Sequence, residues 1–179
     1  MKDWNVVVSV YENCYAQGQE LLEQLGSVGR TEFFNILAMK VADIGKCMEQ
    51  LQDMTIKDPL STACISRFVP VLCTFTFQSP SEFEEKARLT VCNWIPSLQG
   101  KTFYVRMHRR GFKGKLSSMD EEHFLDDYLL KSLELAGTPG RISFHDPDAV
   151  IIVETIGPRA GISYWTRAEL QHYSLLRID

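Results

Sequence analysis

The sequence contains no long apolar run and no leader-like N-terminal segment. A membrane-spanning helix needs about 18 consecutive apolar residues, and no run in the chain approaches that length. The opening residues MKDWNVVVSV include an acidic side chain, Asp3, and lack the basic start, long apolar stretch and small-residue cleavage site of a signal peptide. These absences predict an intracellular, cytoplasmic protein.

Cysteine is scarce, and the five cysteines show no pairing motif. Their number is odd and no two of them form a C-x-x-C pair, which argues against a disulfide framework and against a cysteine-rich zinc site. We therefore expect small buried hydrophobic residues in a reducing compartment. The five are Cys14, Cys47, Cys64, Cys73 and Cys92.

The common signatures of nucleotide-binding and hydrolytic enzymes are also missing. There is no G-x-G-x-x-G after an expected strand, no G-x-x-x-x-G-K-[S/T] phosphate loop and no G-x-S-x-G nucleophile motif. His123 and Asp127 share one face of an expected helix, but the helix dipole already explains acidic residues in its first turns. We therefore predict no catalytic residue, no metal site and no cofactor.

Basic residues are fewer than acidic ones, 19 against 23, but they are concentrated in one segment. The net charge is −4, yet residues 101–115 carry six basic residues and no acidic one, which leaves −10 for the rest of the chain. An acidic protein with one basic segment has a candidate anion site. The six are Lys101, Arg106, Arg109, Arg110, Lys113 and Lys115.

The hydrophobic patterning predicts an α/β protein in which strands and helices alternate before a final hairpin. We expect one continuous strand over 65–77, interrupted at most by Pro70. Two capping boxes mark helix starts, one with Ser79 and Glu82 and one with Ser118 and Glu121. The expected strands are 4–12, 33–41, 65–77, 101–110, 148–156 and 162–165, and the expected helices are 16–25, 43–54, 79–94, 117–137 and 167–176.

From about Ser79 onward the chain contains an ordered set of motifs. They are the strand TFYVRMHRRG, the LSS before a capped acidic helix, HDPDAVIIVETIG and AGISYW. The most specific of them is the pattern formed by Pro147, Asp148, Ile151, Val153 and Glu154. In this set of motifs the chain resembles a THUMP domain, a module of tRNA-modifying proteins.

The first half looks like the smaller α/β region that precedes THUMP in the tRNA-acetylation adaptor subfamily. The resemblance implies two regions, a ferredoxin-like-type α/β region over 1–78 packed on a THUMP RNA-binding domain over 79–179 with a mixed sheet. It also implies binding of structured tRNA while a partner or fused domain performs the chemistry.

Strand alternation separates the side chains of the basic segment. Phe103, Val105 and Met107 suit a core, whereas the alternate positions from Tyr104 to Arg110 face the other way. Arginine grips phosphate, glycines let the loop approach it, and an aromatic ring stacks on an unpaired base. The predicted RNA-binding residues are Lys101, Tyr104, Arg106, Arg109, Arg110, Phe112, Lys113, Lys115, Arg159 and Arg167.

We expect a non-catalytic adaptor that binds tRNA or another structured RNA for a modifying enzyme such as an acetyltransferase. One alternative is a small RNA-acting enzyme, whose sign is a deep pocket holding a perturbed acid or histidine beside the basic segment. Another is a regulatory domain that binds no RNA, in which the basic residues are scattered or paired with acids.

Overall fold

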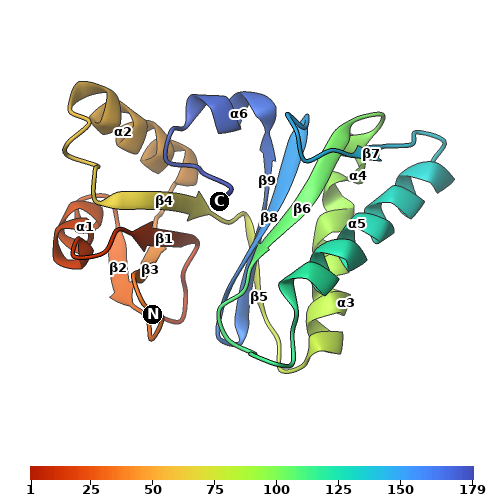
Figure 1. Ribbon diagram of the computed structural model, residues 1–179, viewed down its shortest axis with the longest axis horizontal. Coiled ribbons are helices and arrows are strands. Elements are labelled where there is room, and N and C mark those ends of the chain that lie inside the picture. Colours follow the sequence, from red (N-terminus) through yellow and green to blue (C-terminus); the bar gives the residue numbers. More distant parts are fainter. The chain divides into compact units, whose positions relative to one another are not determined.

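The computed structural model describes all 179 residues, which form two compact units (Figure 1). The first unit consists of residues 1–71 together with the C-terminal residues 170–179, and the second consists of residues 72–169. None of the helices combines the length and the apolar character needed to cross a membrane.

The first unit is a four-stranded antiparallel sheet with strand order β2-β3-β1-β4 and two helices. The βαββαβ succession with this strand order is the ferredoxin-like arrangement that was predicted. Its elements are β1 Val6–Val10, α1 Tyr15–Glu23, β2 Ser27–Arg30, β3 Ile36–Lys40, α2 Ile44–Lys57 and β4 Ile65–Pro70.

Strand β2 was not predicted from the sequence. Its four residues, SVGR, contain a glycine and none is buried, so it lacks the apolar alternation that indicates a strand. It forms because the hairpin with β3 places Gly29 opposite Ala38 in an antiparallel ladder. Helix α2 begins as predicted, because the Asp43 carboxylate accepts a hydrogen bond from the Lys46 amide at 2.9 Å.

The second unit is a mixed five-stranded sheet with strand order β5-β9-β8-β6-β7. Strand β6 runs parallel to β7 and β8, while β9 is antiparallel to both β8 and β5. Its elements are β5 Cys73–Thr76, α3 Pro80–Val91, the 3₁₀ helix η1 Cys92–Trp94, α4 Ile95–Leu98, β6 Thr102–His108, α5 Ser118–Leu135, β7 Arg141–Ile142, β8 Ala149–Ile156 and β9 Arg159–Thr166, and α6 Arg167–His172 follows.

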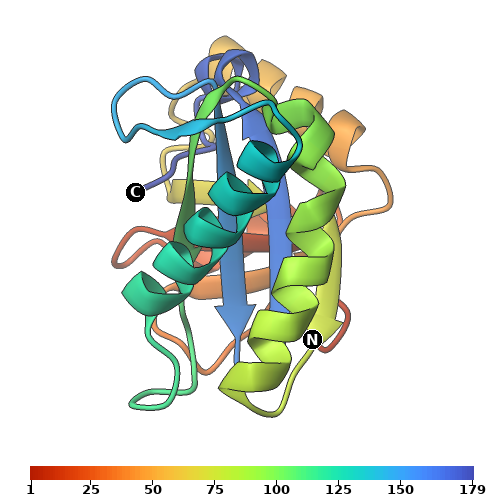
Figure 2. The ribbon, with the colours of Figure 1, turned by 90° about the vertical axis from the view of Figure 1, so that its right-hand side faces the viewer.

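Helices α3 and α5 lie side by side over one face of this sheet (Figure 2). Phe103, Val105 and Met107 of β6 enter the core beneath them, as the strand alternation predicted. The mixed sheet and the α/β class are confirmed.

The segment over 65–77 forms two strands in two different sheets rather than one strand. Strand β4 ends at Pro70, and β5 begins at Cys73 and pairs with β9. The second compact unit therefore starts at Leu72, whereas the sequence placed the boundary between Gln78 and Ser79. The sequence boundary was placed at Ser79 because the helix cap there is a clear local signal, whereas the change of sheet between Pro70 and Cys73 is not.

The two predicted capping boxes differ in outcome. Ser79 caps α3 by accepting a hydrogen bond from the Glu82 amide at 3.2 Å. Helix α5 is capped by Ser117, which accepts from the Asp120 amide at 3.3 Å, and not by Ser118. The cap therefore lies one residue earlier than predicted, and Glu121 does not take part in it.

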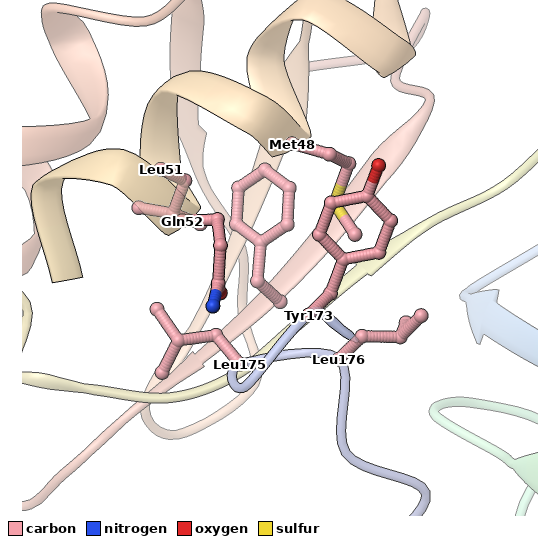
Figure 3. Close-up of a pocket in the computed structure, with 7 residues that line it drawn as sticks. Met48, Leu51, Gln52, Tyr173, Leu175 and Leu176 are labelled. Carbon is pink, nitrogen blue, oxygen red and sulfur yellow. The ribbon is translucent and has the colours of Figure 1, made fainter. Parts of the chain in front are cut away.

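The C-terminal residues complete the core of the first unit (Figure 3). Tyr173, Leu175 and Leu176 gather against Met48 and Leu51 of α2, and the Phe68 amide donates to the Leu175 carbonyl at 2.8 Å. The cavity among these side chains measures about 10 Å³, room for no more than one water molecule. This region is therefore a packed core and not a ligand site.

Candidate nucleic-acid interface

Arg109 and Arg110, which follow β6, have different surroundings. Arg110 is held by an ion pair within the protein. Its guanidinium pairs with the carboxylate of Glu154, which is fully buried on β8, and the His108 Nδ1 lies 3.0 Å from the other oxygen of that carboxylate. The Arg110 amide also donates to the Thr155 hydroxyl at 2.8 Å. Arg110 therefore compensates a buried negative charge, as expected for a partner of Glu154.

Arg106 and Tyr104 of β6 also have partners within the protein. The Arg106 guanidinium lies 3.8 Å from the Glu122 carboxylate and 5.7 Å from the centre of the Tyr104 ring. Tyr104 is only 5% exposed, and its ring centre lies 5.0 Å from that of Phe144. A ring so enclosed does not present a free face on which a base can stack.

The two predicted arginines of the last hairpin are held by neighbouring side chains. Arg159 begins β9 rather than lying in the turn, and its guanidinium donates to the Thr74 hydroxyl at 2.7 Å. Arg167 lies 2.9 Å from the Asp146 carboxylate and 3.2 Å from that of Asp148.

Asp148, from the family-like Pro-Asp pattern, joins the starts of β6 and β8. Its carboxylate accepts hydrogen bonds from the Thr102 amide at 2.8 Å and from the Thr102 hydroxyl at 2.9 Å. These hydrogen bonds lower the pKa of Asp148, and the charges of Arg167 and Lys101 act in the same direction. The pattern thus has a structural role at this position.

The loop from Arg109 to Lys115, which joins β6 to α5, carries the accessible cations. Lys113 and Lys115 are exposed and form no ion pair, and the half-buried Arg109 donates from Nη1 to the Gly111 carbonyl. The ring of Phe112 lies 4.8 Å from that of Phe77 and packs against the core. Phe112 therefore anchors the loop, and its ring is not displayed for stacking.

The loop has one position that requires glycine. Gly111 has φ +103°, and a Cβ there would lie 2.9 Å from the Cα of Gly157 in the neighbouring hairpin turn. This close approach, together with the hydrogen bond from the Gly157 amide to the Arg110 carbonyl at 2.9 Å, fixes the start of the loop.

A hollow of about 610 Å³ opens beside this loop at the N-terminus of α5. Arg109 and Lys115 supply positive charge to its lining, while Glu84, Asp120 and Glu121 supply negative charge. The full lining is Pro80, Glu84, Arg109, Gly114, Lys115, Leu116, Ser117, Ser118, Asp120 and Glu121. A site of mixed charge suits a ligand that has both an anionic group and hydrogen-bond donors.

Glu121 is the unexpected residue of this hollow. It is only 5% exposed, and its Oε2 atom has no hydrogen-bond partner. Burial, together with the smaller effect of the charges of Glu84 and Asp120, raises the pKa of Glu121 to about 7. The sequence did not indicate Glu121 as a site residue, because Glu121 was assigned to a capping box with Ser118.

Two further acids of α5 hold the free edge of β6. The Val105 amide donates to the Asp126 carboxylate at 2.9 Å, and the Met107 amide donates to Glu122 at 2.7 Å. Burial raises the pKa of Asp126 to about 7, against the opposing effect of the Val105 hydrogen bond. Asp126 therefore faces the sheet, and no group of three or more His, Cys, Asp or Glu side chains is arranged to hold a metal ion.

The loop holds five of the ten predicted residues, Arg109, Arg110, Phe112, Lys113 and Lys115. Arg110 pairs with Glu154 and Phe112 packs against the core, so Arg109, Lys113 and Lys115 are the loop cations without an acidic partner. Lys101 is exposed but precedes β6, so the seven residues of that strand separate it from the loop. Most of the others have partners within the protein. Pairing of basic residues with acids was expected for a domain that binds no RNA, and this part of that expectation is met.

Comparison with known proteins reveals relatives in fold only. No protein-family model matches the chain, and no curated protein matches it in sequence. Several solved structures do share its fold. One is PH1313 from Pyrococcus horikoshii Ot3, at 13% identity and a TM-score of 0.58, with 92% of this chain and 55% of that chain covered.

Two further matches are TrmN from Thermus thermophilus and a 4-thiouridine synthetase in complex with RNA and ATP. TrmN has 15% identity and a TM-score of 0.61, with 90% of this chain and 45% of that chain covered. The synthetase has 14% identity and a TM-score of 0.55, with 92% and 42% covered. The chain therefore spans about half the length of the structures it matches.

These comparisons correct the prediction that the protein is not an enzyme. The 4-thiouridine synthetase is an enzyme, and other matched structures are described as a possible methylase from Clostridium difficile 630 and a putative methyltransferase. Sequence motifs missed this association because the matches are in fold, at identities of 13–16%. The chain has the fold found in part of these longer proteins.

Proposed function

We propose that this protein binds structured RNA, with tRNA as the first candidate, through the loop from Arg109 to Lys115 and the hollow beside it. The observation that carries the proposal is the position of the loop cations. Lys113 and Lys115 are exposed without an acidic partner, and Arg109 and Lys115 line the 610 Å³ hollow. Exposed cations that are not neutralised within the protein are the ones available to phosphates.

The mixed charge of the hollow favours a nucleotide over a bare phosphate. Arg109 and Lys115 suit the phosphate, whereas the carboxylates of Glu84 and Asp120 suit the N–H donors on a base edge. Gly114, at φ +76°, has no atom within 4 Å of the position a Cβ would take, so the RNA backbone has room to approach.

The shared fold supports the resemblance to the THUMP domain, and the described RNA complex of the 4-thiouridine synthetase supports RNA as the ligand. We assign the second unit, residues 72–169, as the RNA-binding domain. Its role is recognition of tRNA in the cytoplasm for a modifying reaction. The catalytic domain that acts with it belongs to the same polypeptide or to a partner such as an acetyltransferase.

A salt titration of binding to whole tRNA tests this proposal, with an unstructured RNA of the same length and duplex DNA as controls. We expect tighter binding to tRNA and a linear fall of log affinity with log salt that corresponds to several phosphate contacts. Equal affinity for all three nucleic acids, or none for tRNA at low salt, contradicts the proposal.

A second candidate function, that of an RNA-acting enzyme, rests on Glu121, because it is an acid with a shifted pKa in a hollow beside the basic segment. A carboxyl with a pKa of about 7 is suited to transfer protons at neutral pH, and Arg109 in the same hollow suits a phosphate that gains charge. The reaction would be attack of a ribose 2′-hydroxyl on the adjacent phosphate, with Glu121 taking the hydroxyl proton. The new bond closes a 2′,3′-cyclic phosphate as the bond from phosphorus to the 5′-oxygen of the next nucleotide breaks, and the proton on Glu121 passes to that leaving oxygen. Cleavage of tRNA by the wild-type chain that Glu121→Gln abolishes supports this function, whereas intact RNA contradicts it.

A further inference from the structure

Two cysteines that are distant in sequence meet in the first unit. Cys14 is the N-cap residue of α1, and Cys64 directly precedes β4. Their sulfur atoms lie 2.6 Å apart, and both side chains are half-buried. No local motif indicates this pair, because 50 positions separate the two residues.

The backbone around the pair is fixed on both sides. Strands β1 and β4 are antiparallel neighbours, and Val10 at the end of β1 is paired with Ile65 at the start of β4. The Tyr11 amide donates to the Cys64 carbonyl at 3.0 Å, and the Cys14 amide donates to the Tyr11 carbonyl at 3.1 Å. Two thiols held together by a sheet end and a closed turn need no movement of the chain to react.

We propose that Cys14 and Cys64 form a reversible disulfide by exchange with a low-molecular-weight disulfide. The Cys14 thiolate attacks one sulfur of the oxidant and expels a thiolate, which leaves a mixed disulfide on Cys14. The Cys64 thiolate then attacks the Cys14 sulfur and expels the second thiolate. The protein loses two hydrogen atoms and the oxidant becomes two thiols.

The surroundings of the two sulfurs assign the order of these steps. The Cys64 thiol donates its hydrogen to Cys14, and this hydrogen bond raises the pKa of Cys64. Cys14 is therefore the residue that reacts first, and it lies at the N-terminal end of α1.

The other three cysteines serve as internal controls. Cys47 is buried, and burial raises its pKa to about 11, so it is unreactive. Cys73 and Cys92 are half-buried like the pair, but no sulfur contact joins them to another cysteine. Selective oxidation at Cys14 and Cys64 therefore depends on their proximity and not on exposure alone.

The disulfide closes a loop that contains α1, β2, β3 and α2, which is most of the first unit. Cross-linking a loop of this length reduces the freedom of the unfolded chain and stabilises the folded state. We expect the thermal midpoint of the oxidised protein to exceed that of the reduced protein by at least about 5 °C.

The test treats the full chain with oxidised glutathione, blocks free thiols with iodoacetamide and maps the peptides without reduction. We expect one cross-linked peptide pair that joins Cys14 to Cys64, with Cys73 and Cys92 still available for alkylation. Addition of excess reduced glutathione should restore both thiols. Alkylation of Cys14 and Cys64 to the same extent as Cys73 contradicts the proposal.

Cys14→Ser is the matched variant, because serine is a favoured N-cap residue and should preserve the start of α1. It should show no cross-link, leave Cys64 available for alkylation as Cys73 is, and lose the rise in thermal midpoint. Cys73→Ser should behave as the wild-type protein does. A rise in midpoint that persists in Cys14→Ser contradicts the assignment.

Discussion

The cations of the second unit belong to two regions with different uses. The first region comprises the sheet and its ends, where Arg106 of β6, Arg110 just after β6 and Arg167 at the start of α6 each lie against an acidic side chain of the fold. The second is the rest of the loop between β6 and α5, where Lys113 and Lys115 are exposed and Arg109 donates to a backbone carbonyl. The difference shows that a basic stretch of sequence is not one basic surface, since Arg106 and Arg110 pair with acids of the fold while the other loop cations remain available.

The largest expected effect separates Arg110 from its neighbour Arg109. Arg110→Ala leaves the buried Glu154 carboxylate without its guanidinium partner, so we expect it to destabilise the protein by about 3 kcal/mol. Arg109→Ala removes a side chain that contacts only the loop backbone and should cost less than about 1 kcal/mol. Urea unfolding of both variants measures the difference, and equal losses of stability contradict the division of cations into two regions.

The pH dependence of stability tests the acids that hold α5 to β6. Because the pKa of Asp126 is raised to about 7 from an ordinary value of 3.8, the folded state keeps a proton that the unfolded state releases. The free energy of unfolding therefore falls as pH rises from 3.8 to about 7, and the loss is complete above the pKa of the folded state.

Asp126→Asn removes this titration while an oxygen remains to accept from the Val105 amide. Relative to the wild-type protein, the variant should gain on the order of 2 kcal/mol between pH 4 and pH 8. Urea midpoints at the two pH values give the gain. A difference between the proteins that is the same at both pH values means that Asp126 is ionised in the folded state.

The smallest of these effects compares two glycines of the loop. Both glycines have a positive φ, but Gly111→Ala also introduces a Cβ against the Gly157 backbone, whereas Gly114→Ala meets no atom within 4 Å. We expect the first substitution to cost about 1 kcal/mol more than the second. Thermal unfolding of the two variants measures this difference. Equal costs would show that the contact between the loop and the hairpin turn contributes nothing.

The sequence predicted the α/β class, both sheets in outline and the core face of β6, because apolar alternation and capping residues are local signals. It missed β2, which has a single apolar side chain other than glycine and no buried residue. It also merged β4 with β5, because a change of sheet leaves no local signal beyond Pro70.

For the candidate site, the sequence identified the basic segment but not its division. Which arginine pairs with Glu154 depends on the parallel register of β6 and β8, in which His108 lies opposite Glu154. The burial of Glu121 depends on a one-residue shift of the α5 cap. Neither fact is visible without the fold.

The most direct measurement of the central claim is tRNA affinity at fixed low salt for the triple variant Arg109→Ala, Lys113→Ala, Lys115→Ala. The control replaces three exposed lysines outside the loop, Lys46, Lys57 and Lys131, with alanine, so that the change in charge is the same. We expect the loop variant to bind at least about 10-fold more weakly, with a salt slope lower by about 3, while the control retains most of its affinity. Equal affinity of the two variants contradicts the assignment of the loop as the RNA-binding surface.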